Sequence, residues 1–179
     1  MADGGELVRA AREWKARFAA AAGRNVNKFT GAVTIEILRA ALAGEGVATS
    51  ARDVFVLGVP PEVDLILPFH WVEAPLGLVY KPDQVALALE VKNGGAYPGS
   101  FQKVRRDFDL LRAAGVRCAY LTLEEGRRYK LAVTEERVGA PCFTLAWHSR
   151  FGGPFEPSGD WARFLEFVRG ALGRVPGRV

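Results

Sequence analysis

Hydrophobic residues recur at intervals of three and four in four segments of the chain, which is the spacing of an amphipathic helix. The first segment runs from Glu6 to Ala22, the second covers residues 32–44, the third begins at Ser100 and the last covers residues 161–172. Ser100 is a suitable N-cap for the third helix. The expected core-facing positions are Leu7, Ala11, Trp14 and Phe18 in the first helix, Phe101, Val104, Phe108 and Leu111 in the third, and Trp161, Phe164, Leu165 and Val168 in the last.

Short aliphatic runs between these helices predict β-strands. Residues 53–58 and 63–68 form a predicted hairpin with its turn at VPPE, residues 59–62, and VALALEVK at 85–92 is a third strand. We interpret the aromatic- and proline-rich segment 69–83 as a loop or an irregular hairpin. The strands predicted after the third helix are 116–124, 129–134 and 142–149.

The order helix, helix, three strands, helix, strands, helix predicts an α/β or α+β fold in three layers, with a mixed central β-sheet flanked by helices. A chain of 179 residues is long enough for one domain with a proper core and hardly long enough for two. We therefore expect a single domain over residues 1–179. It comprises an N-terminal amphipathic helix in 1–27, an αβββαβ core in 28–125, and additional strands with a C-terminal helix in 126–179.

The composition is that of an ordinary folded protein, with 49% hydrophobic and 25% charged residues. A net charge of +4 permits contact with a polyanion without demonstrating it. Cys118 and Cys142 belong to no metal-binding or disulfide pattern. No signal-peptide core and no run of 18 apolar residues occurs, so we expect a cytoplasmic protein without a membrane span.

The strand VALALEVKNGG, residues 85–95, changes character at its end, where Glu90 and Lys92 share one face of the strand. Asp64 lies in the preceding strand, and the two carboxylates could converge as hard oxygen ligands for Mg²⁺. Lys92 could then stabilise charge on a phosphoryl group. Glu36 lies in an apolar part of the second helix, which is unusual for an acid.

Simpler interpretations remain open for each of these residues. Glu90 and Lys92 could form an exposed ion pair at a strand end. His70 and His148 are better explained as surface or packing residues than as metal ligands. The basic residues of the helix after the strand could line a nucleic-acid groove or only face solvent, and they are Lys103, Arg105, Arg106 and Arg112.

From Val33 to about Leu123 the sequence resembles the PD-(D/E)xK nuclease superfamily, which has the restriction-endonuclease-like fold. EVDLILP is similar to the segment with the family's first acid, and LEVKNGG is similar to the acid-x-Lys segment. The resemblance implies that Asp64 and Glu90 are metal ligands and that Lys92 is the catalytic lysine. Glu36 would complete the metal shell from the helix.

Gln102 resembles a glutamine of exonuclease-like members, although the tyrosine that usually accompanies it has no clear counterpart. Val63 stands where many members have proline before the first acid.

The resemblance implies a nuclease that hydrolyses phosphodiester bonds, probably in DNA, with Mg²⁺ as cofactor and Mn²⁺ able to replace it. Gln102, Lys103, Arg105 and Arg106 are the predicted nucleic-acid contacts. A homodimer is possible, because one small site would need a second copy to cut both strands at once. The alternative is a catalytically silent nucleic-acid-binding or assembly module with the same fold.

Overall fold

The structure is a computed structural model that describes residues 3–24, 27–47, 50–70, 72, 78–94, 98–126, 134–150 and 152–173. The helices are α1 (Gly4–Ala22), α2 (Asn27–Gly44), α3 (Pro98–Ala113), α4 (Glu135–Val138) and α5 (Asp160–Leu172), with a short 3-10 helix η1 (Pro82–Gln84). The strands are β1 (Ala51–Val56), β2 (Val59–Pro68), β3 (Val79–Tyr80), β4 (Val85–Gly94), β5 (Cys118–Gly126), β6 (Cys142–His148) and β7 (Phe155–Pro157).

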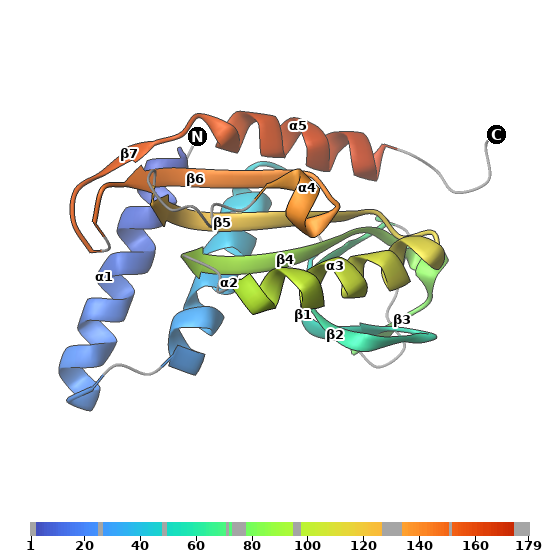
Figure 1. Cartoon of the computed structure of the whole chain (residues 1–179), viewed down its shortest axis with the longest axis horizontal. Coiled ribbons are helices and arrows are strands. Elements are labelled where there is room, and N and C mark those ends of the chain that lie inside the picture. Colours follow the sequence, from blue (N-terminus) through green and yellow to red (C-terminus); the bar gives the residue numbers. More distant parts are fainter. Residues whose placement is uncertain are drawn as a thin grey trace.

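The strands form one mixed sheet in the order β3-β1-β2-β4-β5-β6-β7 (Figure 1). Its centre is antiparallel from β1 to β2 to β4 and then parallel from β4 to β5 to β6. Because β4, β5 and β6 are parallel, their carboxyl ends lie at the same end of the sheet. The mixed sheet flanked by helices confirms the predicted α/β fold class.

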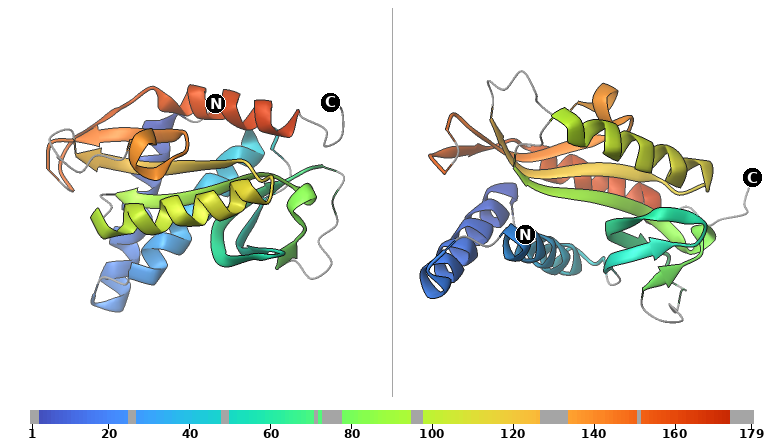
Figure 2. Two further views of the ribbon diagram at one scale, coloured as in Figure 1. Left: turned by 45° about the vertical axis from the view of Figure 1, so that its right-hand side comes forward. Right: turned by 60° about the horizontal axis from the view of Figure 1, so that its bottom comes forward.

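Helices cover both faces of the sheet and make three layers (Figure 2). Buried residues of α1, α2 and α5 form one core with odd-numbered residues of β4, including Leu87, Leu89 and Val91. Buried residues of α3 and α4 form the second core on the opposite face, with Ala88 of β4 and Tyr120 of β5. The alternation of side chains along β4 therefore separates the two cores.

Most predicted elements are present, and two details of the prediction are wrong. The β1–β2 turn lies at Leu57 and Gly58 rather than at VPPE, because Gly58 adopts the positive φ of 83° that a tight turn needs. Trp14, expected in the core, is 50% exposed and lies under the Arg17 guanidinium. The predicted strand 129–134 falls almost entirely outside the described residues, and Thr134 caps α4.

Arg12 of α1 ties three distant segments together. Its guanidinium contacts the Glu124 carboxylate of β5 at 2.5 Å, donates to the Gly153 carbonyl at 2.6 Å, and lies 4.8 Å from the centre of the Phe155 ring. The Glu124 side chain is only 3% exposed, so its charge depends on Arg12 for compensation.

We therefore expect Arg12→Ala to lower the free energy of unfolding by about 3–5 kcal/mol, because it leaves a buried carboxylate without its partner. Arg17→Ala is the matched control. Arg17 and Glu13 form an ion pair on the same helix with both side chains more than 60% exposed, and such pairs contribute at most about 0.5 kcal/mol. Urea unfolding of both variants checks this, and similar losses would contradict the role given to Arg12.

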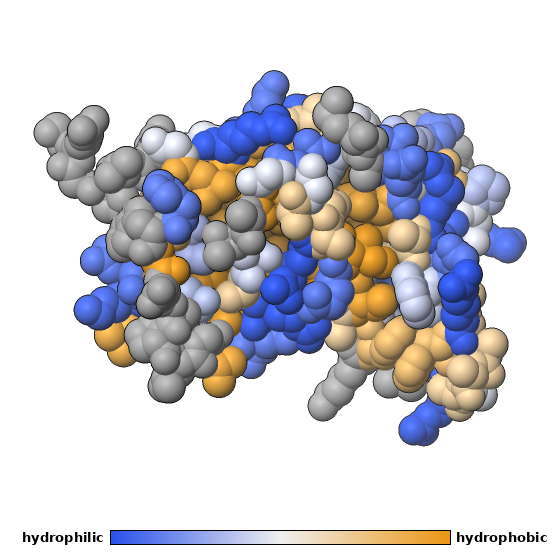
Figure 3. Space-filling view, turned by 180° about the vertical axis from the view of Figure 1, so that it is seen from behind, coloured by the Kyte–Doolittle hydropathy of each residue, from blue (hydrophilic) through white to orange (hydrophobic). Residues whose placement is uncertain are grey.

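Hydrophobic and hydrophilic residues are interspersed on the face shown in Figure 3. The exposed large hydrophobic residues include Phe55, Leu57, Leu78 and Val79, which belong to neighbouring segments at the β1–β3 edge, where Phe55 pairs with Val79. Within the described ranges, no helix is long and apolar enough to cross a membrane.

Candidate active site

The site begins where β2 and β4 stop pairing. Leu65 and Leu89 are the last paired residues toward the carboxyl end of β4, so continuing the antiparallel register puts Asp64 opposite Glu90. Beyond this pair the Asp64 Oδ2 atom accepts a hydrogen bond from the Val91 backbone N–H at 2.9 Å. The strand end therefore holds the Asp64 carboxylate in position.

Lys92 joins the two acids. Its Nζ atom lies 3.2 Å from Asp64 Oδ2 and 2.5 Å from Glu90 Oε1. The three side chains are only 20–35% exposed, so they lie in a partly buried recess that still reaches solvent. The structure thus brings together the three residues that the sequence selected, while their catalytic roles remain predictions.

The electrostatics of the three groups are coupled. Burial raises the pKa of Glu90, and the charge of Asp64 acts in the same direction, against the lowering effects of Lys92 and Lys103. Burial lowers the pKa of Lys92, but Glu90 and Asp64 together outweigh it and raise that pKa above its ordinary value. At neutral pH Lys92 is therefore an ammonium group held between two acids.

The raised pKa of Glu90 predicts how metal-free stability depends on pH. Because this pKa is higher in the folded protein, the folded state binds more protons than the unfolded state between the two values. Ionised Glu90 thus lowers stability above its folded pKa, and this loss disappears as the pH falls to the ordinary carboxylate value. We expect Glu90→Gln to be more stable than the wild type at pH 7, with a difference that shrinks toward pH 4.

Urea unfolding in EDTA across this pH range is the measurement. Glu62→Gln is the control, because Glu62 is an exposed acid on β2 away from the pair. A Glu90→Gln difference that stayed constant with pH would show that the Glu90 carboxyl does not carry this effect.

The donor set fits a hard divalent cation. Asp64 and Glu90 converge on one position that already holds the Lys92 ammonium, and together the three groups carry one net negative charge. Mg²⁺ is often held by one or two carboxylates, with water and phosphate oxygens completing the octahedron. The described part of the chain contains no group of three His, Cys, Asp or Glu side chains placed to share a metal.

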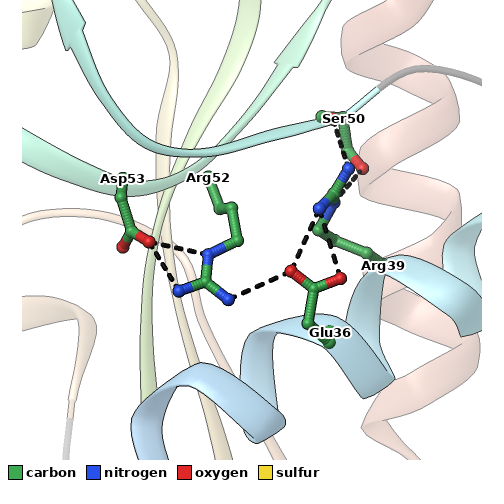
Figure 4. Close-up of polar contacts among 5 residues, drawn as sticks. All are labelled: Glu36, Arg39, Ser50, Arg52 and Asp53. Carbon is green, nitrogen blue, oxygen red and sulfur yellow. Dashed lines mark hydrogen bonds and ion pairs between the residues drawn. The ribbon is translucent and has the colours of Figure 1, made fainter. Parts of the chain in front are cut away.

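Glu36 does not join this pair, which corrects the expectation that it completes the metal shell. Its carboxylate pairs with Arg39 of α2 at 3.1 Å and with Arg52 of β1 at 3.0 Å (Figure 4). Its side chain is 50% exposed. Partial burial opposes ionisation, but the hydrogen bonds and charges of the two arginines outweigh it and lower the pKa of Glu36. Two nearby arginines therefore compensate the acid that the sequence assigned to a metal.

The predicted nucleic-acid contacts lie on the exposed side of α3. Gln102 is exposed, and Lys103 and Arg106 have side chains that are 68% and 77% exposed. Lys103 forms an ion pair with Asp107 at 2.7 Å, and its charge also acts on Glu90. Arg105 instead donates to the Glu136 carbonyl of α4 at 3.2 Å, so part of its function is structural. Nucleic-acid binding by these residues remains a prediction.

Sequence reasoning missed a polar row on β5. Tyr120 and Thr122 are both 1% exposed and pair in register with Glu90 and Lys92, respectively. The signal was present in CAYLTL, where a tyrosine and a threonine stand two residues apart on one strand face. Only the parallel register with β4 shows that this face lies next to the site.

A scan of protein families finds no match to the sequence, and no curated protein matches it. Among solved structures, the chain is similar to NucC of P. aeruginosa ATCC27853 in a cAAA-bound form. The TM-score is 0.61 at 11% identity, over 98% of this chain and 94% of that one.

NucC of E. coli MS115-1 is also similar. Its cAAA-bound form has a TM-score of 0.58 at 12% identity over 96% of this chain and 90% of that one. Its apo form has a TM-score of 0.51 at 14% identity over 83% and 85%. At such low identities the likeness concerns the fold, and it supports the nuclease-like fold that the sequence predicted.

Proposed function

We propose that this protein is a divalent-metal-dependent nuclease that hydrolyses phosphodiester bonds in DNA. The observation that carries the proposal is the convergence of Asp64 and Glu90 on one cation position, with Lys92 as their common partner. The nuclease-like fold supports it, because it is the fold that the acid and acid-x-Lys segments implied.

Each residue has a distinct role in this proposal. Asp64 and Glu90 would hold Mg²⁺, with Mn²⁺ able to replace it. A metal bound there supplies a polarised phosphoryl oxygen and a water of lowered pKa. Lys92, once released from the two carboxylates, lies next to the phosphate and donates hydrogen bonds to the oxygens that gain charge in the transition state.

The overall reaction is hydrolysis. The oxygen of a water molecule forms a bond to phosphorus, the bond from phosphorus to the leaving oxygen breaks, and that oxygen takes up a proton. Gln102, Lys103 and Arg106 are exposed on α3, which follows the site strand, and would contact the DNA backbone. Arg105 would contribute less, because it also binds α4.

Incubation of closed circular plasmid, linear DNA and RNA with the protein and Mg²⁺ or Mn²⁺ tests the proposal. We expect nicking or linearisation of the plasmid, and EDTA should abolish it. Cleavage of the circle identifies endonuclease action, because an exonuclease needs a free end. Absence of cleavage with either metal would count against the nuclease function.

A catalytically silent nucleic-acid-binding module is the second candidate. The observation that favours it is that only two carboxylates, without a third acid, converge in the described part of the chain. Binding of labelled DNA without any metal-dependent product would support this candidate. If the protein cuts both strands together, we propose that it does so as a homodimer, which light scattering in the presence of DNA can test.

A further inference from the structure

The Tyr120 hydroxyl is a buried polar group that the mechanism has not used. The residue is 1% exposed, and its ring packs in the core beneath α3 with Phe101 and Val104. Among the described residues the hydroxyl has no hydrogen-bond partner. Buried hydroxyl groups almost always have such a partner, so an unpaired one calls for an explanation.

Its position points to the active site. The Cα of Tyr120 pairs with that of Glu90 across the parallel β4–β5 ladder, and both side chains lie on the same face. Burial raises the pKa of Tyr120, and the charge of Glu90 raises it further. Thr122 also lies near the hydroxyl and lowers this pKa, although the two form no hydrogen bond of acceptable length and angle.

Lys92 explains why Glu90 and Tyr120 are not bonded in the metal-free protein. Its ammonium holds Glu90 Oε1 at 2.5 Å and thereby sets the orientation of the carboxylate. When a divalent cation takes the place of the ammonium between Asp64 and Glu90, Glu90 loses this donor. A ligating carboxylate ordinarily has a hydrogen-bond partner outside the metal shell that orients it.

We propose that Tyr120 is the positioning residue for Glu90, and that its hydroxyl donates a hydrogen bond to the Glu90 carboxylate in the metal-bound protein. This inference rests on the proposed function, because it requires Glu90 to be a metal ligand. Tyr120 does not touch the substrate, and it acts by fixing the orientation of one ligand. The unpaired hydroxyl is then a group that is satisfied only in the loaded site.

Mn²⁺ binding to the full chain, measured by calorimetry without DNA, tests the proposal independently of activity. We expect Tyr120→Phe to weaken Mn²⁺ binding about 10-fold or more, the size usual for loss of a hydrogen bond to a metal ligand. Tyr80→Phe is the matched control. Tyr80 is another buried tyrosine in the same core, on β3, and its loss should leave Mn²⁺ affinity unchanged.

Two further readouts separate positioning from a purely structural role. In EDTA, Tyr120→Phe should melt at the wild-type temperature or above, because it removes a hydroxyl that has no partner. Addition of Mn²⁺ should shift the tyrosine absorbance band of the wild type and of Tyr80→Phe, and Tyr120→Phe should lose this shift.

Each outcome decides the question. A Tyr120→Phe variant that binds Mn²⁺ as tightly as the wild type overturns the positioning role while leaving the metal site in place. A variant that melts lower in EDTA but keeps its Mn²⁺ affinity shows a structural hydrogen bond instead, for example to Glu125. Failure of the wild type to bind Mn²⁺ overturns the proposed metal site and this inference together.

Discussion

Replacement of Lys92 by alanine is expected to lower the rate of DNA cleavage about 100- to 1,000-fold, the usual cost of removing one donor that stabilises transition-state charge. DNA affinity should remain nearly unchanged, because one lysine is a small part of a contact with many phosphates. Single-turnover cleavage and filter binding, both with Mn²⁺, measure the two effects separately.

The metal must be present in both experiments. Lys92 compensates two carboxylates in the metal-free protein, so its loss leaves Asp64 and Glu90 to repel each other there. Lys81→Ala is the matched control, because it removes an exposed lysine outside the site. If Lys92→Ala lost DNA affinity in proportion to its rate, Lys92 would be a binding residue rather than a catalytic one.

Asp64→Asn is expected to lose most of the thermal stabilisation that Mn²⁺ gives to the wild type. A ligand that binds only the folded state at 100 times its Kd adds about 2.7 kcal/mol. For a chain of this size, that corresponds to a rise in melting temperature of about 5–10 °C. Melting curves with and without Mn²⁺ at matched ionic strength are the measurement, because salt alone changes charge interactions.

Glu36→Gln provides the matched control for this experiment. The sequence assigned Glu36 to the metal, whereas the structure pairs it with Arg39 and Arg52. The variant should therefore keep the full Mn²⁺-induced rise. An equal rise in Asp64→Asn and in the wild type would exclude Asp64 as a ligand, and an absent rise in Glu36→Gln would restore Glu36 to the metal site.

Local patterns in the sequence were sufficient to predict much of this site. The alternation along residues 85–92 puts Glu90 and Lys92 on one face of β4, opposite the aliphatic residues that pack under α2. The helical spacing of Phe101, Val104, Phe108 and Leu111 likewise predicted the buried side of α3. Such features depend on neighbours within a few residues, so they can be read from one segment.

Features that depend on distant partners could not be predicted. The position of Asp64 opposite Glu90 follows from the β2–β4 register, and a shift of one residue would turn Asp64 to the other face. Glu36 looked like an unpaired acid until the fold brought Arg52 of β1 to it. Glu124 was interpreted as the start of a turn, yet the structure buries it in β5 against Arg12, which is 112 residues away in sequence.

Cleavage of closed circular plasmid by the wild type and by Asp64→Asn, side by side with Mn²⁺, tests the central claim most directly. It joins the proposed metal ligand to the proposed reaction in one comparison. We predict that the wild type converts the plasmid to nicked or linear product and that Asp64→Asn leaves it closed. Cleavage by Asp64→Asn at the wild-type rate would contradict the claim that the pair Asp64 and Glu90, with Lys92, forms the active site.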